Sequence, residues 1–160
     1  DPKERAENIM IVDLMRNDLS KIAQKNSVHV NELCGVYSFE TVHQMISTVS
    51  CVLKKNTSFV DVLKATFPMG SMTGAPKISA MELIEDCEEF KRGLYSGSIG
   101  YIDPKGDYDL NVVIRTMIYN RLRKTLSCAV GSAITIHSDA EREYQECQVK
   151  IKKMIDVLKY

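Results

Sequence analysis

A glycine-rich loop that runs directly into a helix is the feature that most restricts the fold of this chain. The loop spans residues 67–77 and reads FPMGSMTGAPK. Gly70 and Gly74 allow the backbone to approach a ligand closely, while Ser71 and Thr73 supply hydroxyl groups. The start of the following helix presents unpaired N–H groups and the positive end of the helix dipole. The loop therefore indicates either a site for a small anion or a plain entry into the helix.

A nucleotide-binding P-loop fits the same residues poorly. The Walker pattern requires Gly-Lys-Ser or Gly-Lys-Thr, whereas Ala75 and Pro76 separate the second glycine of this loop from Lys77. Pro76 also lacks a backbone N–H that a phosphate cradle needs. We therefore do not expect the loop to bind a nucleotide.

The composition favours a globular protein with neither a nucleic-acid nor a membrane partner. The 160 residues are 44% hydrophobic and 26% charged, which suits an ordinary core in one domain or a piece of one. Lys and Arg number 21, as do Asp and Glu, so bulk charge attracts neither nucleic acid nor an anionic membrane. No apolar run approaches the roughly 18 residues of a membrane span. The five scattered cysteines form no CxxC pair, which predicts reduced thiols in the cytoplasm and no zinc site.

Periodicity and capping signals predict a mixture of helices and strands. Asp1 and Pro2 would cap and begin the first helix. Helices are expected at residues 1–23, 58–67, 76–90 and 139–159. Strands are expected at 27–38, 42–53, 96–102, 109–118 and 125–136, with a turn at 103–106. A helix that opens at residues 40 and 41 is the alternative to the strand at 42–53.

Charged residues recur at helical spacing at both ends of the chain. Glu143, Glu146 and Lys150 follow the pattern i, i+3, i+7, and Glu4 and Glu7 are also three residues apart. A solvent-exposed face with weak ion pairs is one interpretation of such a stripe. The other is a Mg²⁺ site, because carboxylates from two helices suit a hard cation that also holds the anionic oxygens of a substrate.

Three further residues are candidates for substrate contact, each with a structural alternative. Arg115 is a lone cation in an apolar strand, where it could grip a carboxylate or simply face water. Tyr95, beside small residues, could donate its hydroxyl to a ligand or lie in the core or at its rim. His43, in an apolar stretch, is either catalytic or a core histidine with satisfied hydrogen bonds.

Six segments, in order along the chain, resemble the successive signatures of chorismate-utilising enzymes. They are KERAENIMIVDLMRNDL at 3–19, VHQMIST at 42–48, GSMTGAPK at 70–77, RGLYSGSIGY at 92–101, IRT at 114–116 and EYQE at 143–146. The superfamily contains anthranilate synthase component I, aminodeoxychorismate synthase component I, and the isochorismate and salicylate synthases. Residues 6–18, 42–48 and 71–74 most resemble the aminodeoxychorismate synthase group, because anthranilate synthases more often have Thr-Leu-Ser-Gly or Thr-Val-Ser-Gly at 71–74.

The resemblance implies a role for each candidate residue. Glu7 and Glu146 would act in catalysis as Mg²⁺ ligands, and Glu4 and Glu143 would tune the metal site or hold metal-bound water. His43 would lie by the ring of chorismate as a further catalytic residue. The remaining candidates would bind substrate: Arg115 and Tyr95 at the pyruvyl carboxylate, Lys150 at a carboxylate near the metal, and Ser71, Gly70 and Gly131 as walls of the pocket.

The resemblance also implies the fold and the extent of the domain. The expected fold is α+β, with antiparallel strands forming part of a two-sheet β-sandwich and helices packed outside, as in anthranilate synthase component I. The chain departs from the family at residues 131–133, where Gly-Ser-Ala replaces the usual Gly-Ala-Gly. The family's Ser-Pro-Glu and Pro-Ile-Lys-Gly-Thr segments, the second with its nucleophilic lysine, do not occur in the sequence. Residues 1–160 therefore resemble the C-terminal portion of a chorismate-binding catalytic domain.

The function implied is Mg²⁺-dependent amination of chorismate to 4-amino-4-deoxychorismate in para-aminobenzoate and folate biosynthesis. Ammonia would come from a glutamine amidotransferase subunit, in the cytoplasm. Anthranilate synthase component I, of tryptophan biosynthesis, is an alternative that the residue preceding Gly-Thr in the upstream segment would distinguish. Two further alternatives are a piece that binds chorismate without turning it over and a globular domain with neither property.

Overall fold

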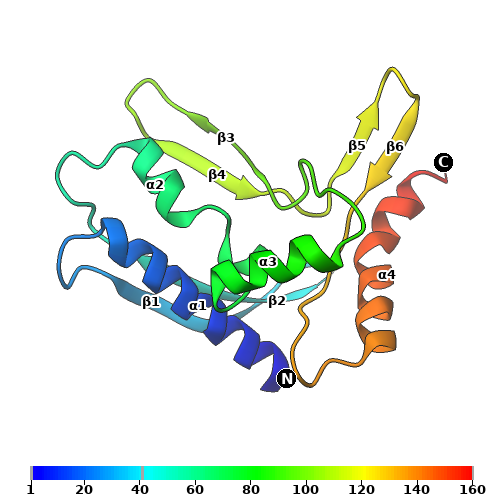
Figure 1. Cartoon of the computed structure of the whole chain (residues 1–160), viewed down its shortest axis with the longest axis horizontal. Coiled ribbons are helices and arrows are strands. Elements are labelled where there is room, and N and C mark those ends of the chain that lie inside the picture. The colour runs from blue at the N-terminus through cyan, green and yellow to red at the C-terminus, as the bar shows by residue number, and fades with distance from the viewer. Residues whose placement is uncertain (1, 41, 160) are drawn as a thin grey trace. The chain divides into compact units, whose positions relative to one another are not determined.

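The chain forms two compact units, Asp1–Glu89 and Phe90–Tyr160, in a computed structural model that describes residues 2–40 and 42–159. The first unit contains α1 (Pro2–Ile22), β1 (His29–Ser38), β2 (His43–Ser50), α2 (Phe59–Thr66), the 3-10 turn η1 (Gly70–Met72) and α3 (Lys77–Cys87). The second contains β3 (Ser98–Ile102), β4 (Tyr108–Val112), β5 (Met117–Asn120), β6 (Thr125–Cys128) and α4 (Ala140–Val157). Figure 1 follows these elements along the chain from α1 to α4.

Helix α1 packs on the hairpin of β1 and β2 at the centre of the first unit (Figure 1). The two strands pair antiparallel, with register irregularities between Val30 and Gly35. Cys34 lies in this irregular stretch with a φ of 56° and is buried. Among the described residues of this unit, the other buried apolar side chains are Val12, Ile22 and Ala23. The core of the first unit therefore lies between the helix and the hairpin.

A short polar network ties α1 to both strands of the hairpin. The Ser47 hydroxyl on β2 donates to Asn8 Oδ1 on α1 at 2.5 Å. The backbone N–H of Cys34 on β1 donates to the same Ser47 oxygen at 2.8 Å. Because Cys34 is buried and Ser47 and Asn8 are half-buried, these bonds fix the helix on the hairpin in one position.

A capping box begins α2, at the position where the sequence predicts a helix from residue 58. The backbone N–H of Asp61 donates to Ser58 Oγ at 3.2 Å, and the Ser58 N–H donates to Asp61 Oδ2 at 2.9 Å. The Ser58 hydroxyl also donates to Oδ2, at 2.7 Å. These bonds hold the pKa of the Asp61 carboxyl below its usual value, with the bond from the Ser58 side chain the largest cause.

Replacing Ser58 with alanine is expected to destabilise α2 by about 1 kcal/mol at neutral pH. Because the pKa of Asp61 is lower in the folded state, its carboxylate stabilises the fold above about pH 4 and loses this effect as the pH falls through the folded pKa. The difference between wild type and variant should therefore shrink in acid. Urea unfolding and amide hydrogen exchange of α2 measure it, with the exposed Ser79→Ala in α3 as control. Equal effects at residues 58 and 79 would contradict the capping box.

The second unit contains two antiparallel hairpins and one long helix. β3 pairs with β4 from Ser98 opposite Val112 to Ile102 opposite Tyr108, and β5 pairs with β6. The turn at 103–106 joins the first pair, as predicted, with the Gly106 N–H donating to the Asp103 carbonyl at 3.0 Å. Asp139 caps α4 by accepting from the Arg142 N–H at 3.1 Å.

The α+β class with antiparallel strands is confirmed, and most elements form where the sequence predicts them. The hairpins are antiparallel pairs of the kind that a sandwich fold contains. The segment at 43–50 is a strand, so the alternative of a helix opening at residues 40 and 41 is wrong. Asp1, expected to cap the first helix, lies outside the described residues. Among the described residues, no helix is both long and apolar enough to span a bilayer.

Two predicted strands are shorter than expected. The strand at 109–118 is broken, because Arg115 has a φ of 49° and the Ile114 N–H bonds back to the Val112 carbonyl at 3.0 Å. The strand at 125–136 ends at Cys128. Beyond it, backbone groups bond to side chains, as when the Thr135 N–H donates to Ser138 Oγ at 2.9 Å. Local bonds thus replace the expected strand ladder at both places.

Candidate functional site

Four of the expected site residues form a connected group within the second unit. Lys150 Nζ on α4 donates to the carbonyl of Gly131 at 2.9 Å and lies 2.5 Å from Oε1 of Glu146. A Cβ placed on Gly131 would lie 2.8 Å from the Tyr95 hydroxyl oxygen. Residues from three separate segments thus place a phenol, an ammonium and a carboxylate near one backbone position. The group Tyr95, Gly131, Glu146 and Lys150 is called the α4 cluster below.

Tyr95 is held by a tight turn that precedes β3. Its N–H donates to the Arg92 carbonyl at 3.0 Å, and the Ser96 N–H donates to the carbonyl of Val113 at 2.9 Å. Val113 is only 3% exposed, so the turn is anchored on a buried backbone segment. The Arg92 guanidinium lies 5.9 Å from the centroid of the Tyr95 ring, a cation–π contact that further fixes the ring. Tyr95 is half-buried, with its hydroxyl facing Gly131.

The charged stripe on α4 is not a plain solvent-exposed face. Glu143 is 5% exposed and belongs to the first turn of the helix, where the dipole favours a carboxylate. Glu146, one turn later, has a side chain 38% exposed, and that of Lys150 is 31% exposed. A buried carboxylate is stable only where positive charge or hydrogen bonds compensate it. The stripe is therefore partly buried, with two carboxylates and one ammonium on one side of the helix.

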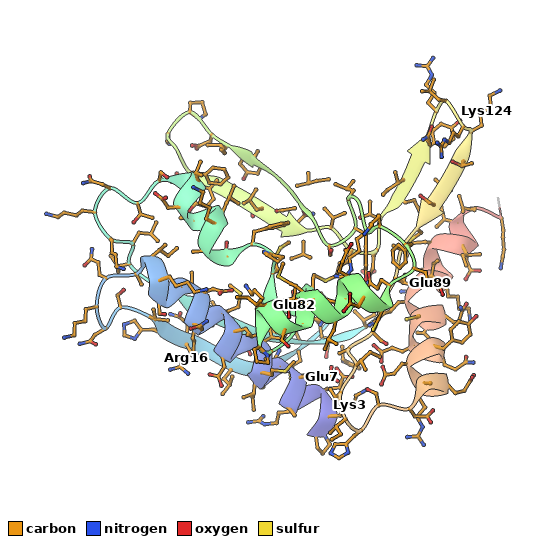
Figure 2. All side chains as sticks on the ribbon, in the orientation of Figure 1. Lys3, Glu7, Arg16, Glu82, Glu89 and Lys124 are labelled. Carbon is orange, nitrogen blue, oxygen red and sulfur yellow. The ribbon has the colours of Figure 1, made fainter. Side chains whose placement is uncertain are left out.

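The other expected carboxylates lie on α1 in the first unit. Figure 2 shows Lys3 and Glu7 near the beginning of this helix. Lys3 Nζ lies 3.7 Å from Glu7 Oε1, and the Glu7 side chain is 19% exposed. Glu4, in the first turn, is exposed. The expected ligands thus occur as one pair on α1 and one pair on α4.

The donor set fits Mg²⁺ in its chemistry. Within residues 2–40 and 42–159, no group of three or more His, Cys, Asp or Glu side chains could hold a metal ion by itself. Mg²⁺ seldom needs such a cage, because it usually takes one or two carboxylates and completes its shell with water and substrate oxygens. Glu143 and Glu146, one buried and one half-exposed on successive turns, supply oxygen donors of that kind.

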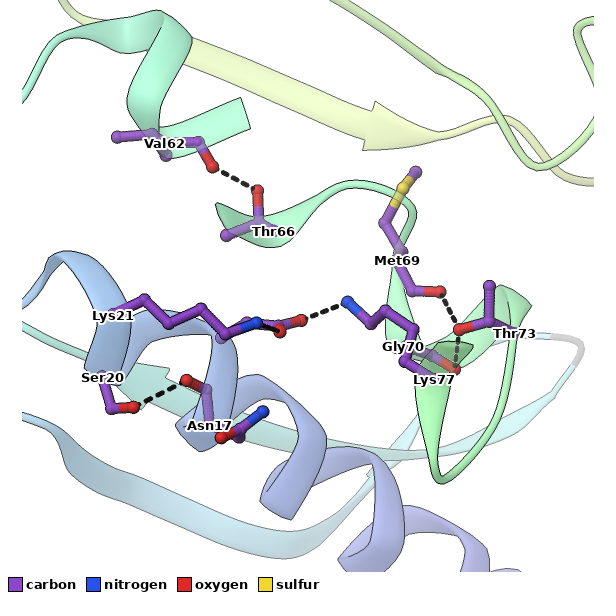
Figure 3. Close-up of polar contacts among 10 residues, drawn as sticks. Asn17, Ser20, Lys21, Val62, Thr66, Met69, Gly70, Thr73 and Lys77 are labelled. Atoms are coloured by element: carbon purple, nitrogen blue, oxygen red, sulfur yellow. Dashed lines mark hydrogen bonds and ion pairs between the residues drawn. The ribbon is translucent and has the colours of Figure 1, made fainter. Parts of the chain in front are cut away.

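The glycine-rich loop packs against α1. Gly70 is buried, and a Cβ on it would lie 3.0 Å from Leu14 Cβ. The Thr73 hydroxyl donates to the Met69 carbonyl at 3.1 Å, an internal bond drawn in Figure 3. Ser71 is exposed, and its hydroxyl makes no hydrogen bond within the described part of the chain. Of the two hydroxyls expected to meet a ligand, Ser71 is therefore the one that is available.

Two expected site residues, Arg115 and His43, have no contact with the α4 cluster or with the carboxylates of α1 through a hydrogen bond or ion pair of the described residues. Arg115 is exposed and lies between β4 and β5 with a positive φ, so its placement inside a strand was wrong. His43 is exposed at the start of β2, and its Nδ1 lies 2.9 Å from Ser38 Oγ. A buried core histidine is therefore wrong as an interpretation of His43. In the described residues, no hydrogen bond or ion pair links Arg115 or His43 to another expected site residue.

The sequence interpretation missed a buried ion-pair cluster beside the loop. Asp18 on α1 is 1% exposed and binds Lys77 Nζ at the start of α3, while Lys21 Nζ lies 2.9 Å from its Oδ1. Figure 3 shows Lys21 and Lys77 reaching this carboxylate from two elements. An acidic residue four positions after Leu14, on the face that carries apolar residues, was the available signal.

The sequence of the chain is similar to that of a known protein family and of several known proteins. Residues 1–156 match the family described as chorismate binding enzyme. The sequence is 47% identical over 150 residues to the probable aminodeoxychorismate synthase, chloroplastic, of Oryza sativa subsp. japonica, covering 94% of this chain and 16% of that protein. It is 42% identical over 156 residues to aminodeoxychorismate synthase component 1 of Escherichia coli (strain K12), covering 98% of this chain and 34% of that protein.

A solved structure agrees with these matches. The crystal structure of anthranilate synthase component I from Streptococcus pneumoniae TIGR4 aligns with a TM-score of 0.82 and 41% identity. The alignment covers 96% of this chain and 35% of that one. The chain thus spans about a third or less of the length of these relatives.

Proposed function

The chain belongs to the chorismate binding enzyme family, and we propose that residues 1–160 form the C-terminal portion of a catalytic domain that aminates chorismate to 4-amino-4-deoxychorismate. Relatives named aminodeoxychorismate synthase, at 42% and 47% identity, support this product. In the net reaction the 4-hydroxyl of chorismate leaves as water, and ammonia supplies the new C–N bond and loses one proton to that hydroxyl. No oxidant or reductant is required.

The α4 cluster carries this proposal. Its phenol and ammonium, held near Gly131, suit an anionic substrate, since each can donate a hydrogen bond to a carboxylate oxygen. Chorismate has two carboxylates, so it requires two separate anchoring points. Tyr95 and Arg115 would hold the pyruvyl carboxylate, and Lys150 would face the carboxylate near the metal. The half-buried setting of Tyr95 and Lys150 strengthens both interactions relative to water.

The carboxylates of α1 and α4 would hold Mg²⁺. Glu7 and Glu146 would bind the ion directly, while Glu4 and Glu143 would hold its water ligands. When bound, Mg²⁺ would supply positive charge that anchors a substrate carboxylate and assists departure of the 4-hydroxyl. The ion pair between Glu146 and Lys150 holds the Glu146 carboxylate in one orientation.

The loop and His43 would complete the pocket. Gly70, buried against Leu14, fixes the loop backbone, and Ser71 would present its free hydroxyl to the substrate. His43 would lie by the ring, with Nδ1 oriented by Ser38 and Nε2 left for proton transfer. The lysine that starts the reaction in the aminodeoxychorismate enzymes would come from a segment outside these 160 residues.

Ammonia would be supplied by a glutamine amidotransferase subunit. The name "component 1" of the Escherichia coli relative supports a partner component. We expect the bacterial-type arrangement of a cytoplasmic enzyme in the pathway to para-aminobenzoate and folate. Neutral net charge is consistent with a small-molecule substrate and a protein partner.

Product analysis tests the proposal directly. The natural protein that carries this sequence is incubated with chorismate, Mg²⁺ and ammonium, and the products are identified by mass spectrometry. We expect 4-amino-4-deoxychorismate. The 41% identity to anthranilate synthase component I of Streptococcus pneumoniae favours anthranilate as the second candidate product. Formation of anthranilate would show that the protein acts as an anthranilate synthase. Unchanged chorismate would contradict both candidate activities.

Replacing Gly131 with alanine is expected to raise KM for chorismate about tenfold with little loss of stability. The new Cβ would lie 2.8 Å from the Tyr95 hydroxyl and would push that group away from the substrate. Steady-state kinetics measures the effect. Tyr95→Phe removes the atom that clashes, so the double variant should behave like Tyr95→Phe alone. Additive losses in the double variant would show that the two residues act separately.

A further inference from the structure

The glycine-rich loop is attached to one face of α1 at two positions that flank Ser71. Gly70 packs on Leu14, and Lys77, where the loop ends, binds Asp18. We propose that Asp18 is a positioning residue: through Lys77 it sets the position of Ser71 for the substrate. The substrate assignment in this inference rests on the proposed function, whereas the attachment of the loop does not.

The Asp18–Lys77 ion pair is shielded from water and holds the end of the loop in one position. Asp18 is 1% exposed and the Lys77 side chain is 17% exposed, so water competes weakly for either group. A buried ion pair of this kind adds little stability compared with apolar residues of the same size. Its contribution is geometric, because the charges are satisfied only when α3 starts at one point beside α1. The half-buried Lys77 ammonium therefore specifies where the loop must end.

Helical spacing places the attachment points on the same face as Glu7. At about 100° per residue, Leu14 lies about 20° to one side of Glu7 around α1, and Asp18 about 20° to the other. The two anchors of the loop and the proposed metal ligand thus follow one line along the helix. Because α1 keeps a fixed spacing between Glu7, Leu14 and Asp18, the loop attached to Leu14 and Asp18 holds Ser71 at a defined distance from Glu7.

Lys21 provides a matched comparison for Lys77. Both ammonium groups bind the Asp18 carboxylate, Lys21 from the next turn of the same helix and Lys77 from the end of the loop. Lys21→Met and Lys77→Met each remove one ammonium from the same carboxylate with similar volume. Only the second detaches the loop. A merely structural role for the cluster predicts a loss of stability in both variants, smaller in Lys21→Met because the Lys21 side chain is 53% exposed, but no faster exchange confined to the loop.

The first measurement uses no substrate and applies to the natural protein. Amide hydrogen exchange is followed for residues 70–74 in wild type, Lys21→Met and Lys77→Met. We expect exchange in Lys77→Met to be faster by about tenfold or more, and exchange in Lys21→Met to stay near wild type. Equal acceleration in the two variants, or none in Lys77→Met, overturns the positioning role whatever reaction the protein catalyses.

The second measurement concerns chorismate. For Lys77→Met we expect KM to rise about tenfold while kcat changes less than about threefold, with Lys21→Met near wild type. In the Ser71→Ala background the additional effect of Lys77→Met should largely disappear, because the loop then has no hydroxyl to position. Faster loop exchange with unchanged kinetics would overturn the substrate role of the loop. If the wild-type protein does not convert chorismate, the proposed function is refuted. The positioning role of Asp18 is then decided by the hydrogen-exchange experiment alone.

Discussion

Replacing Glu146 with glutamine is expected to lower kcat/KM for chorismate by about 10²–10³-fold in the natural protein. The glutamine is nearly isosteric, but it removes the negative charge that the proposal assigns to Mg²⁺. It also removes the ionic partner of Lys150, whose Nζ lies 2.5 Å from Oε1 of Glu146. Both effects act on the charges that are proposed to hold the substrate, so the loss should appear in kcat and in KM.

The measurement has a second readout and a matched control. Calorimetric titration with Mg²⁺ should show weaker binding in the variant, independently of turnover. Glu141→Gln lies on the same helix but is exposed, and its carboxylate accepts a hydrogen bond from Gln145 Nε2 at 2.7 Å. That variant should retain activity within about twofold, as surface charges usually contribute little. Full activity in Glu146→Gln would remove this residue from the proposed metal site.

Local signals in the sequence were sufficient to predict the helices and the hairpin of β3 and β4. The helix predicted at 58–67 begins at a capping box of Ser58 and Asp61, and Asp139, predicted to begin the last helix, caps α4. These features depend on residues within one turn of each other, where propensity and capping decide the outcome. The turn at 103–106 was predictable for the same reason.

The misplaced strand ends depend on local backbone geometry and on side-chain bonds to the backbone, which periodicity does not show. Besides the local bonds beyond Cys128, the carbonyl of Gly131 accepts a hydrogen bond from Lys150, which lies 19 positions later on α4. The break at Arg115 depends on a backbone twist with a φ of 49° that no turn residue announces. Periodicity shows an apolar segment at both places, but it cannot show which partner will bind the backbone.

The candidate site likewise contains features that the sequence predicts and contacts that only the structure shows. The residue types of the α4 cluster were identifiable from motifs, whereas the contact of Gly131 with the Tyr95 hydroxyl requires the three-dimensional structure. The Asp18–Lys77 pair joins residues 59 positions apart. Nothing in the spacing of the two indicates that they meet, because the path between them includes both strands of the hairpin and α2.

Replacing Asp18 with alanine is expected to destabilise the first unit by about 3–5 kcal/mol, the largest effect on stability that we predict. Removing the carboxylate leaves the ammonium of Lys77, with a side chain only 17% exposed, without its counter-charge in a region that excludes water. Lys21, with a side chain 53% exposed, can turn to solvent and should contribute less to the loss. Urea unfolding of the natural protein, combined with amide exchange of α1, measures the change.

A surface ion pair on the same helix provides the control. Asp13 lies 2.8 Å from Arg16 in an i, i+3 pair whose side chains are 66% and 54% exposed, and Arg16 is labelled in Figure 2. Asp13→Ala also removes an aspartate carboxylate that lies three positions before a cation on α1. Because this pair is exposed, we expect stability to change by no more than about 0.5 kcal/mol. If Lys77→Met is added to Asp18→Ala, the unpaired ammonium is removed and much of the lost stability should return. Similar losses at residues 13 and 18, or no recovery in the double variant, would show that burial of the Asp18–Lys77 pair does not determine its effect.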